Sequence, residues 1–113
     1  MAKYELRKPL DILLQQKQKL DQEKISINDQ HTRYQTELQD LRNSQTGFRT
    51  AKESLSNTVS NRAARKVFDD QISQMQLRVN EVLKELDAID KKNEVVVSQI
   101  KAMDKSIKEL QNS

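Results

Sequence analysis

The sequence predicts an all-α protein: an antiparallel hairpin of two long, coiled-coil-like helices that packs against partner helices. Two heptad stripes of apolar residues, out of phase with each other, run through the two halves of the chain. A segment rich in Ser and Asn separates them. The composition agrees, because helix-forming Gln, Lys, Glu, Leu and Arg dominate, whereas 1 Gly, 1 Pro and 4% aromatic residues suit a compact globular core poorly.

The first helix is predicted at residues 8–57, where a large apolar residue recurs every seventh position. These residues are Leu6, Leu13, Leu20, Ile27, Tyr34, Leu41, Phe48 and Leu55. The companion positions keep the 4-3 rhythm, but five of the eight are polar: Leu10, Lys17, Lys24, His31, Leu38, Gln45, Lys52 and Val59. Pro9 suits a first helical turn, so we expect the helix to begin near Lys8. The stripe ends at Leu55 or Val59.

The turn is predicted at about residues 57–62, because residues 54–61 are crowded with Ser and Asn, which favour caps and turns. Ser60 or Asn61 would cap the second helix. A rival turn at 43–47 ends in Gly47, a residue common just after helix ends. It ranks second because Leu41 and Phe48 stay in phase across it.

The second helix is predicted at residues 62–112 within a single domain, 1–113. Its stripe has thirteen positions, twelve of them apolar, at alternating steps of four and three: Phe68, Ile72, Met75, Val79, Val82, Leu86, Ile89, Asn93, Val96, Ile100, Met103, Ile107 and Leu110. The polar exception, Asn93, either fixes the register of the helices or sits in a wet, exposed position; the sequence leaves both open.

The open half of the hairpin is predicted to bind the partner. With the turn near residue 60, facing residues have numbers that add up to about 120, so Ile25, Val95 and Val97 fall at one level outside both stripes. A two-helix seam cannot cover them all, and we expect them to meet a third helix. The predicted partner-binding residues are Ile12, Leu13, Leu14, Leu20, Ile25, Ile27, Val95, Val96, Val97, Ile100 and Met103.

Other kinds of site find little support in the sequence. The net charge is +3 with interspersed signs, and 0 Cys and 1 His argue against a disulfide or a transition-metal site. His31 is expected to be a seam histidine, with a pH-sensitive contact as the alternative. The turn carries an excess of positive charge, expected to be solvated, with contact to phosphate or anionic lipid as the alternative. No phosphate loop or nucleophile motif is present, so we expect no enzyme activity, cofactor, nucleic-acid binding or membrane span.

In length, composition and helical texture the chain resembles the LXG-associated α-helical proteins of the Gram-positive type VII secretion system. The resemblance lies in the segment from Arg65 to Gln71 that opens the second helix, and in the heptads from Met75 to Leu110. It implies binding to the N-terminal LXG domain of a toxin, often together with a second small helical protein. The chain has no Trp-x-Gly turn, and Ile72 stands where a Phe-x-x-x-Asp export signal would need Asp. It would therefore be the accessory binder.

The predicted function is that of a non-enzymatic adaptor, targeting factor or chaperone for a helical client. The alternatives are a self-associating coiled-coil scaffold and a prefoldin-like holdase. The charged N-terminus has no signal-peptide core, so we expect a cytoplasmic protein, with export without a cleaved signal peptide as an open alternative.

Overall fold

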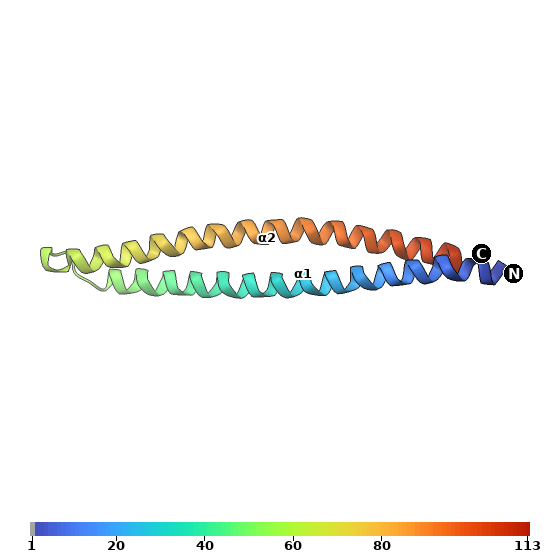
Figure 1. The fold of residues 1–113 in the computed structure, drawn as a ribbon. Coiled ribbons are helices and arrows are strands. Elements are labelled where there is room, and N and C mark those ends of the chain that lie inside the picture. The colour runs from blue at the N-terminus through green and yellow to red at the C-terminus, as the bar shows by residue number, and fades with distance from the viewer. Residues whose placement is uncertain (1) are drawn as a thin grey trace. The chain divides into compact units, whose positions relative to one another are not determined.

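The computed structural model describes the backbone of residues 2–113 and the side chains of residues 8–113. Its elements are helix α1 (Ala2–Glu53), the short 3-10 helix η1 (Val59–Asn61) and helix α2 (Arg62–Gln111). Figure 1 traces α1 from blue to green and α2 from yellow to red, joined at the turn. The predicted all-α hairpin fold is confirmed. The described residues contain no strand, so the β-hairpins that a prefoldin-like holdase needs are not found there.

The reversal lies at residues 54–61, where the main turn was predicted, and the rival turn at 43–47 was wrong. Gly47 lies inside α1 with a negative φ, so it ends no helix. The helix bounds differ from the prediction at both ends of α1. The helix begins at Ala2, because the residues before Pro9 are good helix formers, and Pro9 lies inside it at the loss of one backbone hydrogen bond. It ends at Glu53, before the Ser and Asn residues of the loop.

The turn is held by side chains that bond to backbone carbonyls. The Arg65 guanidinium donates from Nη1 to the carbonyl oxygens of Lys52, at 3.1 Å, and Leu55, at 3.0 Å. It thereby caps the C-terminal end of α1, whose last carbonyls have no partner within the helix. Asn61 donates from Nδ2 to the backbone oxygen of Ser56 at 3.0 Å, so it ties the loop together rather than capping α2 as predicted. Val59, counted in the first stripe, is 80% exposed.

The structure divides into two compact units, each a pair of antiparallel helix segments. Unit 2 (Thr32–Asp87) contains the turn, and its core centres on the buried Val79 and Val82. The rings of Phe48 and Phe68 meet across the helices with their centroids 5.9 Å apart and their planes tilted by 40°. The predicted stripes therefore face each other in this unit.

Unit 2 also buries one polar side chain, Gln45, which is 4% exposed. Its Nε2 donates to the side-chain oxygen of Gln76 at 3.0 Å and to the backbone oxygen of Ile72 at 3.4 Å. A buried amide is tolerated when it is bonded in this way. Nearby, the Arg78 guanidinium binds both carboxylate oxygens of Glu37, with Nη2 3.0 Å from Oε2.

Unit 1 (Met1–His31 and Ala88–Ser113) has a core of buried Ile27, Ile89, Val96 and Ile107. All thirteen positions of the second stripe, in the two units taken together, are buried or partly buried. Leu6, the first residue of the first stripe, lies outside the described side chains. In both units the ion pairs between α1 and α2 join residues whose numbers add up to 121 or, for Glu37 and Arg78, to 115, close to the 120 of the predicted pairing. No described helix is both long and apolar enough to cross a membrane.

Candidate helix-binding groove

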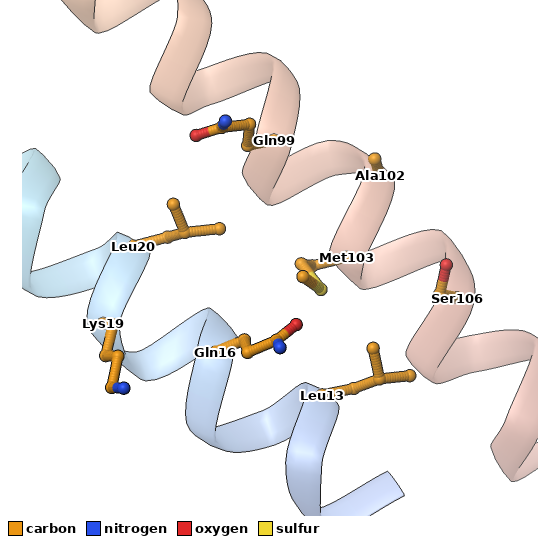
Figure 2. A pocket seen from close by; sticks show the side chains of 8 residues that line it. All are labelled: Leu13, Gln16, Lys19, Leu20, Gln99, Ala102, Met103 and Ser106. Carbon is orange, nitrogen blue, oxygen red and sulfur yellow. The ribbon is translucent and has the colours of Figure 1, made fainter. Parts of the chain in front are cut away.

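Unit 1 carries an open groove between its two helix segments, with a volume of about 490 Å³. Leu13 and Leu20 of α1 and Met103 of α2 extend into the space between the helices, as Figure 2 shows, and form an apolar floor. All three are partly buried. The remaining lining residues are Gln16, Lys19, Gln99, Ala102 and Ser106. An apolar floor between polar walls is the form of site that accepts the apolar stripe of an amphipathic helix.

Two exposed apolar residues extend this surface. Ile12 is 47% exposed and lies four residues before Gln16, and Val95 is 57% exposed and lies four residues before Gln99. Residues four apart share one face of a helix, so both lie on the side of the groove. We call the groove together with Ile12 and Val95 the groove face.

The opposite side of unit 1, which we call the ion-pair face, carries the other predicted residues outside the stripes. At 100° per residue, Ile25 lies on the opposite side of α1 from Gln16, nine positions away. Leu14 falls within 20° of Ile25 by the same rule. Val97 lies seven residues before Asp104, whose Oδ1 is 2.7 Å from the Nζ of Lys17.

That Ile25, Val95 and Val97 meet a third helix therefore stays a prediction, but the helical spacing places Ile25 and Val95 on different sides of the helix pair. Pairing by residue number placed them at the same level along the helices, but it said nothing of their angle around each axis. Ile25 and Val95 are both more than half exposed, whereas Val97 is partly buried. A single docked helix can cover the groove face or the ion-pair face, not both.

The other predicted partner-binding residues belong to the seam between the helices. Ile27 and Val96 are 4% and 2% exposed, so the helix pair already uses them, and Ile100 is partly buried. Five groove residues were missed by the sequence prediction because they are polar or small: Gln16, Lys19, Gln99, Ala102 and Ser106. A signal was present: they flank the stripe residues Leu13, Leu20 and Met103 at helical spacing.

Electrostatic contacts mark the ion-pair face. The hydrogen bond from Lys17 to Asp104, aided by their opposite charges, raises the pKa of the Lys17 ammonium above its ordinary value. The Nε2 atom of His31 lies 3.4 Å from Oδ1 of Asp90. Beside them a small polar hollow of about 220 Å³ is lined in part by Asn93, whose Oδ1 is buried without a hydrogen-bond partner. Asn93 is thus partly buried, and its side-chain oxygen is not bonded.

The positive charge near the turn is partly used within the protein. Nζ of Lys52 lies 2.6 Å from Oδ1 of Asp69, and Arg65 binds carbonyl oxygens. Arg49, Arg62 and Lys66 are exposed. The described residues hold no cluster of three or more His, Cys, Asp or Glu side chains placed to bind a metal ion.

Comparisons of the chain with protein-family models, with curated proteins and with solved structures found no match.

Proposed function

We propose that this protein is a helix-binding adaptor, which covers and orders an amphipathic helix of a client protein in the groove of unit 1. The observation that carries the proposal is the groove face: Leu13 and Leu20 seven residues apart on α1, and Met103 on α2, extended by Ile12 and Val95. Ile12 is nearly half exposed and Val95 more than half exposed. Exposed aliphatic side chains grouped beside a groove are a feature of binding surfaces.

The spacing of the apolar floor residues determines the spacing of apolar residues that a client helix would need. Leu13 and Leu20 lie seven residues apart, about two helical turns, and Met103 lies across from them on α2. A client helix with apolar residues at i, i+3 or i+4, and i+7 would place one over each gap between these side chains. Met103 is unbranched and can adjust to different client side chains.

The walls indicate polar flanks on the client. Gln16, Gln99 and Ser106 offer hydrogen bonds, and Lys19 offers a positive charge. A client helix with Asn, Gln or Ser beside its apolar stripe, and Asp or Glu at the level of Lys19, would satisfy them. The resemblance to LXG-associated proteins makes the N-terminal LXG domain of a type VII secreted toxin the first client to test, alone and with a second small helical protein.

The test is binding of the purified chain to the products of neighbouring genes, by pull-down and then by calorimetry. In the variant Ile12→Asp/Val95→Asp, two charges stand on the groove face. We expect the dissociation constant to rise at least about tenfold, equivalent to about 1.4 kcal/mol, because charged groups would be desolvated beside apolar contacts.

The matched control is Leu14→Asp/Ile25→Asp on the ion-pair face. Those residues are 43% and 60% exposed, close to the 47% and 57% of Ile12 and Val95, so the cost to folding should be similar. This control should bind like the wild-type chain. The groove would be refuted as the client site if both variants stayed helical and bound the client equally well. It would also be refuted if only the control variant lost affinity for the client.

A further inference from the structure

The groove face continues beyond the groove as a third stripe on each helix of unit 1. Steps of four and three connect Ile12, Gln16, Lys19, Glu23, Ser26 and Gln30 on α1. The same steps connect Ala88, Lys92, Val95, Gln99, Ala102, Ser106 and Glu109 on α2. Residues at this spacing lie along one side of a helix, so each set is a seam open to another helix. Four of the thirteen are charged.

The two charges on α1 complement each other in one antiparallel register. When two identical helices pack antiparallel, facing residues have numbers with a constant sum. The register that sets Lys19 against Glu23 of the second copy also sets Gln16 against Ser26 and Ile12 against Gln30. A shift by one step would set Lys19 against Gln16 or Gln30 and leave both charges without an opposite charge.

The same holds on α2. The antiparallel register that sets Lys92 against Glu109 of the second copy also sets Val95 against Ser106 and Gln99 against Ala102. All four charged residues are exposed, and the ion pairs found among the described residues use other side chains. Their charges are therefore available to a second molecule.

One twofold axis satisfies both registers. The midpoint between Lys19 and Glu23 is position 21, and the midpoint between Lys92 and Glu109 lies between positions 100 and 101. The Lys17–Asp104 ion pair fixes which levels of the two helices are neighbours. Four residues onward from Lys17 on α1 is position 21, and four residues back from Asp104 on α2 is position 100. The two midpoints thus lie at one level of unit 1, which is the condition for a symmetric dimer.

We propose that the groove face binds a second copy of this chain, in an antiparallel dimer with Lys19–Glu23 and Lys92–Glu109 contacts between the copies. Symmetry makes each contact occur twice. The dimer covers Ile12, Val95 and the groove, so a client helix has to displace the second copy. This goes beyond the adaptor function, and it is tested on the purified chain without any client.

The experiment is sedimentation equilibrium of the wild-type chain and of charge-reversal variants, with helicity followed by circular dichroism. Lys19→Glu and Glu23→Lys each set like charges face to face in both symmetric contacts. Each should raise the dimer dissociation constant at least about tenfold while helicity stays unchanged. The double variant Lys19→Glu/Glu23→Lys restores opposite charges and should dimerise like the wild type.

A mixture gives the sharpest test of the register. Chains with Lys19→Glu carry two negative charges there, and chains with Glu23→Lys carry two positive ones, so an equal mixture should form heterodimers as tight as the wild-type dimer. A monomeric wild-type chain, or a mixture that associates no better than its components, would overturn the proposed dimer. Either result would leave the adaptor function standing, because the client would then meet no competing second copy in the Ile12→Asp/Val95→Asp test.

Discussion

Asn93 shows how one residue can oppose the stability of the fold that contains it. It occupies a position of the α2 stripe and lines a hollow together with Ile27 and Ile89, and its buried Oδ1 has no hydrogen-bond partner. A buried acceptor without a partner costs roughly 1–3 kcal/mol relative to its state in water. Its neighbours along the stripe, Ile89 and Val96, are aliphatic, so a leucine would continue the stripe. The polar side of the hollow is lined by three other residues: Asn28, His31 and Asp90.

We therefore predict that Asn93→Leu raises the free energy of unfolding, by roughly 1–3 kcal/mol, because the orphaned acceptor is removed and apolar contact is gained. Urea denaturation followed by circular dichroism measures the change. Asn93→Asp is the matched control and should lower stability, since a charge would replace the amide in the same place. A loss of stability in Asn93→Leu would contradict the unbonded state of the acceptor.

The Glu37–Arg78 pair predicts how stability depends on pH. The hydrogen bonds from Arg78 hold the pKa of the Glu37 carboxyl below its ordinary value of 4.5. A depressed folded-state pKa stabilises the folded chain at pH values above the unfolded pKa. That contribution disappears as the pH falls through the folded pKa.

Accordingly, the wild-type chain should be more stable than Glu37→Gln at pH 7, and the difference should shrink below about pH 4.5 and vanish in stronger acid. Urea denaturation of both chains from pH 7 to pH 2.5 gives the comparison. Because the pair is exposed to solvent, the difference at pH 7 should be small and should fall with added salt. A difference that is the same at pH 7 and pH 2.5 would exclude the Glu37 carboxylate as its source.

At the scale of the element, Gly47 tests whether α1 is one continuous helix through residues 43–47. It lies in the helix with ordinary helical backbone, and a Cβ added there would meet nothing within 4 Å. We predict that Gly47→Ala stabilises the chain by roughly 0.5–1 kcal/mol, because alanine has less backbone freedom to lose on folding.

The measurement is the urea midpoint, with Ala88→Gly as the reverse control on an exposed position of α2. The control should lose a comparable amount of stability. If Gly47→Ala were destabilising, the backbone at residue 47 would have to depart from the helix, as the rival turn requires.

The two long helices show what the sequence could and could not predict at this scale. The 4-3 spacing from Phe68 to Leu110 predicted the buried side of α2 at every position, because apolar burial is the main force that orients a helix and its period can be read directly. The end of α1 was placed four residues too late. Leu55 is apolar and in phase, but Arg65 binds its carbonyl oxygen in the loop, a contact made across the turn that no local pattern shows.

For the molecule as a whole, the sequence predicted the pairing of the helices but not the surface that the pairing creates. Facing levels followed from the position of the turn alone. The groove required a further quantity, the angle of each residue about its own helix, and it depends on small and polar side chains such as Ala102 and Gln99 that carry no apolar signal. Ile25 is 60% exposed, but the pairing of levels could not say on which side of α1 it lies.

The two helices divide their seam unequally, and this has a consequence for synthesis of the chain. The seam of α1 includes Lys17, Lys24, His31, Gln45 and Lys52, whereas that of α2 is apolar at twelve of thirteen positions. A ribosome releases the N-terminal helix first. Helix α1, which is made first and has no partner at that time, has the partly polar seam that can be exposed to water. Helix α2, with the strongly apolar seam, is made when α1 is already present to pack against it. Reversing the order of the two helices would leave the aggregation-prone half waiting instead.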